Sequence, residues 1–510
     1  MVVDHSLRSR NAGSDLSRSS SSPSRSILLI LLLYAALLMV FMSADSPIRV
    51  QFPHIDSAWF MMGGKAWFSG MVPYVDFTDS KGPLLWLIYG LAHLIAPNSF
   101  SGMLGFEILI YWITFILLFR SAKLLLHDPG RALLAVFVTS FFFFLPNVHI
   151  EFRAEDINHL FNAVLIYIII KIFIARQPDR QLFFWSGVLL ASSLMIKFNF
   201  TALQAVPVFF MLVYAVKNDG WKGACTRFVY LLVGFVMMLT PFLVYFFSKG
   251  IFIDFIREYF INTLFTVHNI YSAPSPWTTR WAVLYFVILF ALVAYMPKKL
   301  YLSGWFRITV WCWFAATFLM ILSGVHEYYL NLLVIFSFFG ICSLVALCRR
   351  LNILTSSLLG LVVLACIILT SICYKDGEFH DSEGAFRKQA DYDRMTTIFN
   401  SYKDSVGRVP TISYINLMDR GEHIDAGLLP GTKYWAHQNG STEDMHRLNI
   451  EDVFQNRPDF VIVDSENSDA ITRLTAAGYE RIYSYPILYD PSSSLPPRLL
   501  FRRTPSNKSN

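Results

Sequence analysis

Long apolar runs recur along most of this chain, and they constrain its fold more than any other feature. The sequence offers about eleven runs that could cross a bilayer as α-helices. Of its 510 residues, 55% are hydrophobic and 46 are Phe, so a soluble domain of this composition would have little polar surface to offer water. The sequence therefore predicts an α-helical polytopic membrane protein. Its spans are expected at residues 27–41, 102–120, 131–147, 157–175, 182–197, 200–216, 228–247, 280–296, 305–323, 328–347 and 353–373.

Lysine and arginine residues set the expected orientation of these spans. They gather in short linkers, which the positive-inside rule places in the cytoplasm together with the Ser- and Arg-rich tail of residues 1–26. The tail is expected to be disordered. The formal net charge of +6 reflects these linkers and is no signal for nucleic acid. The linkers hold Arg120, Lys123 and Arg131, then Lys171, Arg176 and Arg180, then Lys217, Lys222 and Arg227, then Lys298 and Lys299, and finally Arg349 and Arg350.

The segment Gly82–Ala96 decides on which side later linkers lie. Its roughly 15 residues are short for a span. If it crossed, every later basic linker would change sides, whereas all of them stay inside if it does not cross. We therefore expect a re-entrant or interfacial helix within the first outer loop. The outer face then holds residues 56–81, 151–156, 248–279 and 326–328, and everything after residue 374.

Residues 374–510 differ in composition from the rest of the chain. Hydrophobicity falls and charge rises after Cys373, and helix and strand patterns alternate. We expect a tail (1–26), a transmembrane module (27–373) and a small extracytoplasmic α/β or α+β domain (374–510). All six cysteines lie in or beside spans, so neither a disulfide framework nor a zinc site is implied. Strands are expected at Val409–Ile415, Asp459–Asp464, Arg481–Ile487 and Arg498–Phe501, and helices at Ile450–Asn456 and Asp469–Ala477.

Two charged residues of the first outer loop are suited to chemistry. Asp56 lies where the chain leaves the first span, and Lys81 precedes the expected interfacial helix. Ionisable groups at this depth are costly and are usually kept for function. The carboxylate could take a proton from an attacking hydroxyl or amine, and the lysine could reach a lipid phosphate. The alternatives are a helix-capping aspartate and a lysine that anchors the interfacial helix.

The loop resembles the first extracytoplasmic loop of the C-type glycosyltransferases, in the protein O-mannosyltransferase and aminoarabinose-transferase branch. The resemblance rests on His54-Ile55-Asp56 and on the stretch from Pro73 to Leu84, and it covers about residues 27–350. Gly82 stands where the family usually has proline. The resemblance implies an inverting single displacement from a polyprenyl-phosphate sugar. Asp56 would then be the base and Lys81 a ligand of the carrier phosphate.

The resemblance also assigns roles outside Asp56 and Lys81. Several of these residues have structural alternatives: acids at a helix start complement the helix dipole, and aromatic residues form interfacial belts. Asp76 and Asp79 could hold a divalent cation, but such residues more often stabilise turns. The implied roles are assistance to the base by Asp156 or Glu155, phosphate binding by Lys197, Arg257 and His268, and substrate binding by Tyr74, Asp79, Arg153, His326 and Tyr328.

The apolar spans predict a multi-pass protein of the cell inner (plasma) membrane, and the resemblance implies that it is a glycosyltransferase. Its partners would be the bilayer, a polyprenyl-phosphate sugar donor and an extracytoplasmic glycan, lipid or protein acceptor, with no nucleic acid and no certain cofactor. The rival interpretation is a multi-span transporter or channel with an outer sensor domain. It would favour repeated halves or paired broken helices, which the sequence does not contain. Transfer of a preassembled oligosaccharide by the same fold stays open.

Overall fold

The chain forms two compact units, and each is assembled from segments that are far apart in the sequence. Unit one comprises residues 1–43, 106–241 and 273–373, and unit two comprises residues 44–105, 242–272 and 374–510. The computed structural model describes residues 23–43, 45–48, 55–97, 99–144, 152–264, 288, 303–323, 331–348, 350–374, 382–417, 421–436, 443–486 and 496–504.

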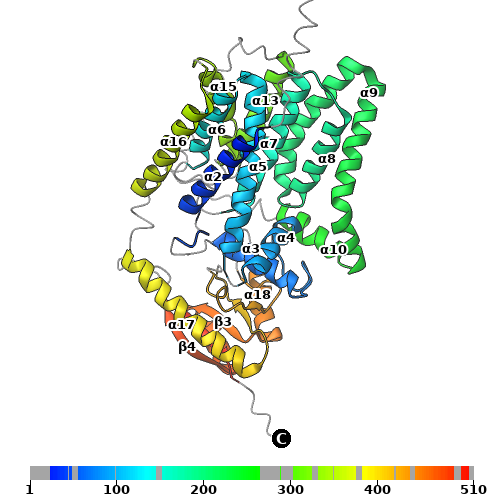
Figure 1. The fold of residues 1–510 in the computed structure, drawn as a ribbon. Coiled ribbons are helices and arrows are strands. Elements are labelled where there is room, and N and C mark those ends of the chain that lie inside the picture. The colour runs from blue at the N-terminus through cyan, green and yellow to red at the C-terminus, as the bar shows by residue number, and fades with distance from the viewer. Residues whose placement is uncertain are drawn as a thin grey trace, which may run out of the picture. The chain divides into compact units, whose positions relative to one another are not determined.

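Unit one consists of helices that lie side by side (Figure 1). In the described part of the chain, six helices are long and apolar enough to cross a membrane: α2, α5, α7, α9, α13 and α16. The predicted helical membrane protein is confirmed at this level, and the count of about eleven spans stays a prediction. The helices are α2 (Arg25–Met42), α5 (Ser101–Leu126), α6 (Pro129–Phe143), α7 (Ala154–Phe173), α8 (Arg180–Leu194), α9 (Phe198–Ser248), α13 (Gly304–Ser323), α14 (Asn331–Val334), α15 (Ser337–Val345) and α16 (Ile353–Tyr374).

Short polar caps separate the apolar runs into individual helices. The Ser24 hydroxyl accepts a hydrogen bond from the backbone N–H of Ile27 at the start of α2, and the Asp128 carboxylate accepts one from that of Arg131 at the start of α6. Asp179 caps α8 in the same way. Such caps satisfy backbone donors that have no partner inside the helix.

A single residue divides α9 into the two spans expected at 200–216 and 228–247. Gly220 has φ of 66° and ψ of −179°, a non-helical conformation that kinks the helix. The expected span at 280–296 lies outside the described residues except for residue 288.

Two helices of the first loop pack against each other and form one part of unit two: α3 (Ile55–Phe68) and α4 (Pro83–Ile95). A Cβ atom on Gly64 would lie 2.4 Å from the backbone nitrogen of Gly90, so the two helix backbones touch at this point. At 13 residues, α4 is about 20 Å long and shorter than the hydrocarbon core of roughly 30 Å. The expected non-crossing placement of this helix stays a prediction. After α9, unit two continues with α10 (Phe252–Phe255) and the π-helix η1 (Ile256–Asn262).

The C-terminal part of unit two is a five-stranded mixed sheet with strand order β2-β1-β3-β5-β4. β1 pairs in parallel with β2 and β3, whereas β5 pairs antiparallel with β3 and β4. The mixed pairing agrees with the expected small mixed α and β domain. The strands are β1 (Thr411–Tyr414), β2 (Leu429–Pro430), β3 (Phe460–Asp464), β4 (Tyr479–Tyr485) and β5 (Arg498–Arg503), and the helices are α17 (Ser382–Val406), α18 (Glu443–Asn456) and α19 (Ser468–Ala476).

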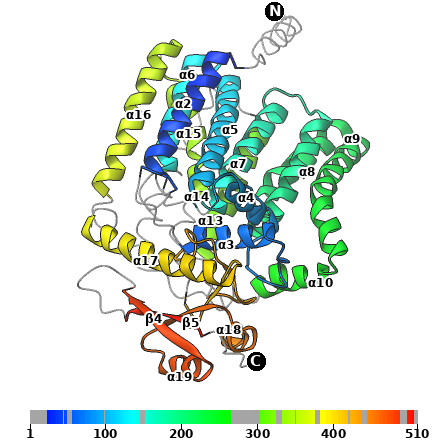
Figure 2. The same ribbon diagram turned by 60° about the horizontal axis from the view of Figure 1, so that its bottom comes forward.

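Helices cover both faces of this sheet (Figure 2). Phe399 and Tyr402 of α17 pack against Phe460 on one face. On the other face, Val461 and Val463 share a hydrophobic core with residues of α18 and α19. The alternation follows from the two-residue period of a strand.

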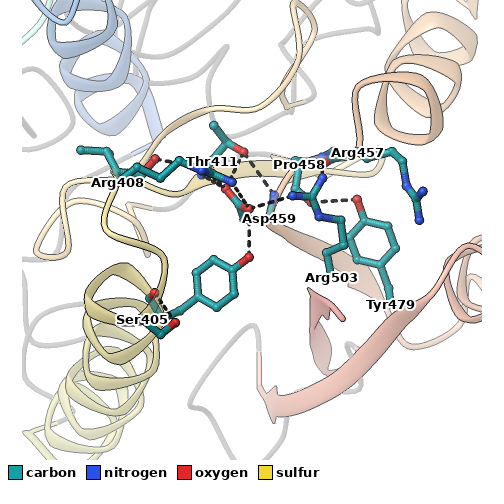
Figure 3. Close-up of polar contacts among 10 residues, drawn as sticks. Ser405, Arg408, Thr411, Arg457, Pro458, Asp459, Tyr479 and Arg503 are labelled. Carbon is teal, nitrogen blue, oxygen red and sulfur yellow. Dashed lines mark hydrogen bonds and ion pairs between the residues drawn. The ribbon is translucent and has the colours of Figure 1, made fainter. Parts of the chain in front are cut away.

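Asp459 fastens α17 to the sheet (Figure 3). Its carboxylate accepts hydrogen bonds from two Arg408 nitrogens, both at 2.7 Å, and from the Thr411 backbone N–H at 2.9 Å. Burial alone would raise the pKa of Asp459, but the bonds from Arg408 and Thr411 outweigh it and lower the pKa. The Tyr402 hydroxyl of α17 donates to the same buried carboxylate at 3.1 Å, so Asp459 links α17 and the segment after it to the sheet.

Candidate active site

A tight turn in the first loop of unit two positions the first group of predicted site residues. The Asp76 carboxylate accepts a hydrogen bond of 2.6 Å from the Val72 N–H, and the Tyr74 N–H donates to the Phe77 carbonyl at 2.7 Å. Tyr74 takes the left-handed conformation with φ of 67°. The turn therefore has a fixed shape, and Asp76 stabilises it locally.

Tyr74 is buried at the centre of this turn. Its ring packs against Trp86, Phe246 and Phe255, and its hydroxyl donates to the Lys81 carbonyl at 3.3 Å. These contacts position the backbone just before α4. The predicted substrate contact of Tyr74 stays a prediction beside this observed structural role.

Asp79 and Lys81 are linked through Ser80, and Asp56 lies close enough in the same unit for its charge to act on Asp79. Lys81 donates to the Ser80 hydroxyl at 3.3 Å, and that hydroxyl donates to Asp79 at 3.2 Å. Burial raises the pKa of Asp79, the Lys81 ammonium opposes this, and the Asp56 carboxylate adds to it. Oδ2 of Asp79 is buried and accepts no hydrogen bond from any described residue. Two carboxylates beside one ammonium could orient a hydroxyl group and hold a phosphate.

A second group of predicted residues lies at the start of α7, in unit one. Lys197 forms a buried ion pair with Glu155, with 2.7 Å between Nζ and Oε1. Asp156 accepts a hydrogen bond from the Tyr111 hydroxyl at 2.6 Å and one from the Arg153 N–H at 3.0 Å. The expected helix-start role of Asp156 is thus present. The proposed roles of these residues in catalysis and phosphate binding stay predictions.

Buried polar residues further along α7 were not singled out from the sequence. Asn158 accepts a hydrogen bond from Gln204 at 2.7 Å, and His159 and Asn331 share one of 2.6 Å. The available signal was the run of polar residues inside an apolar helix, since such residues are rarely placed there without a partner.

Four of the residues predicted to bind phosphate or substrate remain to be placed. Arg257 is exposed on η1. His268, His326 and Tyr328 lie outside the described residues. Within the described chain, no group of three or more His, Cys, Asp or Glu residues is placed to hold a metal ion.

Solved structures of membrane glycosyltransferases share this fold. ArnT from Cupriavidus metallidurans bound to undecaprenyl phosphate matches with a TM-score of 0.57 and 11% identity, covering 95% of this chain and 99% of that chain. The apo state of the same protein matches with a TM-score of 0.54 and 11% identity, covering 94% of this chain and 99% of that chain. The arabinofuranosyltransferase AftD from Mycobacteria gives 0.54 and 13%, covering 95% of this chain and 40% of that one. The likeness establishes an ArnT-like fold.

A family model supplies the enzyme class. The model described as dolichyl-phosphate-mannose-protein mannosyltransferase matches residues 80–245, from the Lys81 turn into α9. No curated protein matches the chain by sequence. The family match and the fold together confirm the class predicted from the sequence, a membrane glycosyltransferase, and its resemblance to the protein O-mannosyltransferase and ArnT branch.

The ion pair between Glu155 and Lys197 generates a prediction. Removing one partner leaves a buried charge uncompensated, at a cost of roughly 3–5 kcal/mol. Glu155→Gln and Lys197→Met should therefore each lower the thermal unfolding midpoint of the purified protein in detergent. The double variant, which leaves neither charge, should recover most of the loss. Additive losses in the double variant would contradict a coupled pair.

Proposed function

We propose that this enzyme transfers a sugar from a polyprenyl-phosphate donor to an acceptor outside the cytoplasm. The observation that carries the proposal is the hydrogen-bonded chain from Lys81 through Ser80 to the buried Asp79 at the start of α4, with Asp56 close enough to act on Asp79 by its charge. Further support comes from the family match, which names a lipid-phosphate sugar donor, and from the fold shared with an ArnT bound to undecaprenyl phosphate. The rival transporter interpretation receives no support from these comparisons.

The proposed reaction is a single displacement with inversion. The acceptor oxygen or nitrogen attacks the anomeric carbon while the bond from that carbon to the phosphate oxygen breaks. The phosphate leaves with the electron pair, and Asp56 takes the proton of the acceptor. Lys81 stabilises the charge that develops on the phosphate. Asp79 would accept a hydrogen bond from a hydroxyl group of a substrate.

The composition of unit two supports the proposed membrane topology. Residues 44–105, 242–272 and 374–510 share this compact unit, so the stretches between them should cross the bilayer an even number of times. Six helical segments lie between the first two: α5, α6, α7, α8 and the two halves of α9. An even number agrees with a non-crossing α4 and eleven spans in total. With the basic linkers in the cytoplasm, the C-terminal domain then lies outside it.

Asp56→Asn tests the catalytic base. The variant keeps the shape of the side chain and removes its charge, so transfer should fall by roughly 10²–10⁴-fold with normal expression. The measurement uses purified protein and a panel of radiolabelled polyprenyl-phosphate sugars. Asp76→Asn is the matched control, because it removes a charge from the same loop while an amide oxygen can still cap Val72. Full activity of Asp56→Asn would rule out the proposed base.

Lys81→Met tests the phosphate ligand. Since the ammonium would contact the carrier phosphate, the variant should raise the KM for the lipid-linked donor by roughly 10-fold or more, with a smaller change for the acceptor. Steady-state kinetics with each substrate varied in turn provide the measurement. An unchanged donor KM would place the phosphate site elsewhere, with Arg257 and His268 as the next candidates.

Cysteine labelling tests the topology. Single cysteines replace Ser17 in the tail, Asn218 at the break in α9 and Ser401 on α17, in a background free of other cysteines. Asn218 and Ser401 are exposed, so accessibility reports the side of the membrane and not burial. An impermeant reagent should label only Ser401→Cys in intact cells. Labelling of Asn218→Cys from outside would mean that Gly82–Ala96 crosses.

A further inference from the structure

The buried carboxylate of Glu258 joins three segments of unit two. Glu258 lies in η1 and is 4% exposed. Its Oε1 accepts hydrogen bonds from Lys433 Nζ at 2.7 Å and from the Tyr434 hydroxyl at 3.3 Å. Its Oε2 accepts them from Asn262 at 2.9 Å and from the Thr78 hydroxyl at 3.4 Å. One oxygen thus faces the C-terminal domain, and the other faces the first loop.

The position of Thr78 gives this contact its functional meaning. Thr78 directly precedes Asp79 and is three residues before Lys81, which are the groups that we assign to substrate and phosphate. Glu258 itself lies on a π-helical turn, a geometry that recurs at functional sites. A shift of the Glu258 carboxylate would therefore move the backbone that presents Asp79.

The Lys433 side of the contact is firmly built into the C-terminal domain. Asn449 donates hydrogen bonds to the carbonyls of both Tyr414 and Tyr434, and the Tyr414 N–H donates to the Trp435 carbonyl at 2.6 Å. Segment 428–435 is thus fixed to strand β1. The ammonium group of Lys433 compensates the buried carboxylate of Glu258, which would be costly to bury without a partner.

The same segment also rests on α3. Lys65 donates to the Leu428 carbonyl at 2.8 Å, and the rings of Trp59 and Trp435 stack at 4.3 Å. Asp56 belongs to the first turn of α3. The C-terminal segment therefore contacts α3, which bears Asp56, through Lys65 and Trp59. Through Glu258 it also reaches the turn before α4, which bears Asp79 and Lys81.

We propose that Glu258 is a positioning residue, through which the C-terminal domain holds the turn of Thr78, Asp79 and Lys81 in its active geometry. This inference rests on the proposed function and assigns a role to residues 374–510. The domain is then part of the catalytic unit. Substrate need not touch Glu258, because the residue acts through Thr78.

Two variant pairs in the full-length protein test the link from either end. Thr78→Val removes the hydroxyl at nearly constant volume, and Thr78→Ser keeps it. Lys433→Met removes the charge that holds Glu258, and Lys433→Arg keeps it. Because a small misplacement of a reacting group is costly, Thr78→Val and Lys433→Met should lower kcat roughly 10- to 100-fold with little change in donor KM. Thr78→Ser and Lys433→Arg should restore most of kcat.

Hydrogen exchange supplies a readout that needs no activity. Lys433→Met removes the charge that holds Glu258, so the hydrogen bond from Thr78 to Glu258 should weaken. Amide exchange of residues 76–81 should then be roughly fivefold faster, the equivalent of losing one hydrogen bond of about 1 kcal/mol. Unchanged exchange there, or a parental kcat in both Thr78→Val and Lys433→Met, would overturn the inference and leave Glu258 a purely structural joint. If the parent transfers no sugar from any donor while the exchange effect is present, the proposed function fails and the mechanical link stands.

Discussion

Buried carboxylates that are compensated by cations hold this molecule together at its internal joints. An ionised group taken out of water without a partner costs several kcal/mol, so each pair constrains the two elements that carry it. One pair joins α7 to the start of α9, the second joins η1 to the C-terminal domain, and the third lies inside that domain. They are Glu155 with Lys197 at 2.7 Å, Glu258 with Lys433 at 2.7 Å, and Glu422 with Arg498 at 2.8 Å.

Asp79 differs from these three carboxylates. Asp79 is as deeply buried, but one of its oxygens accepts no hydrogen bond from the described part of the chain. Lys81 acts on Asp79 electrostatically and through a hydrogen bond to Ser80. Native structures satisfy most buried polar groups, and the exceptions need a reason. The contact that we propose between Asp79 and a hydroxyl group of the substrate would satisfy this oxygen.

The sequence predicted the helical membrane class and the family resemblance, because apolar runs and a short motif are local signals; the roles of the first-loop residues stay predictions. It did not predict α17 or β2. A charged helix resembles a linker when its buried face is narrow, and the Pro430 of β2 argues against a strand unless it lies at an edge. The partners of Lys197 and Glu258 were also out of reach, since 42 and 175 residues separate them from Glu155 and Lys433. No local pattern encodes such contacts.

The contact between Lys65 and Leu428 has a consequence for how the protein is made. The two residues are 363 positions apart, so α3 leaves the ribosome long before its partner. At about 5–20 residues per second, that interval lasts roughly 20–70 seconds. During it the first loop must persist at the membrane without the segment that later covers it. Completion of unit two is therefore a late, post-insertion event, and a nascent chain that stops before residue 428 would have its helices but not the finished support of its candidate site.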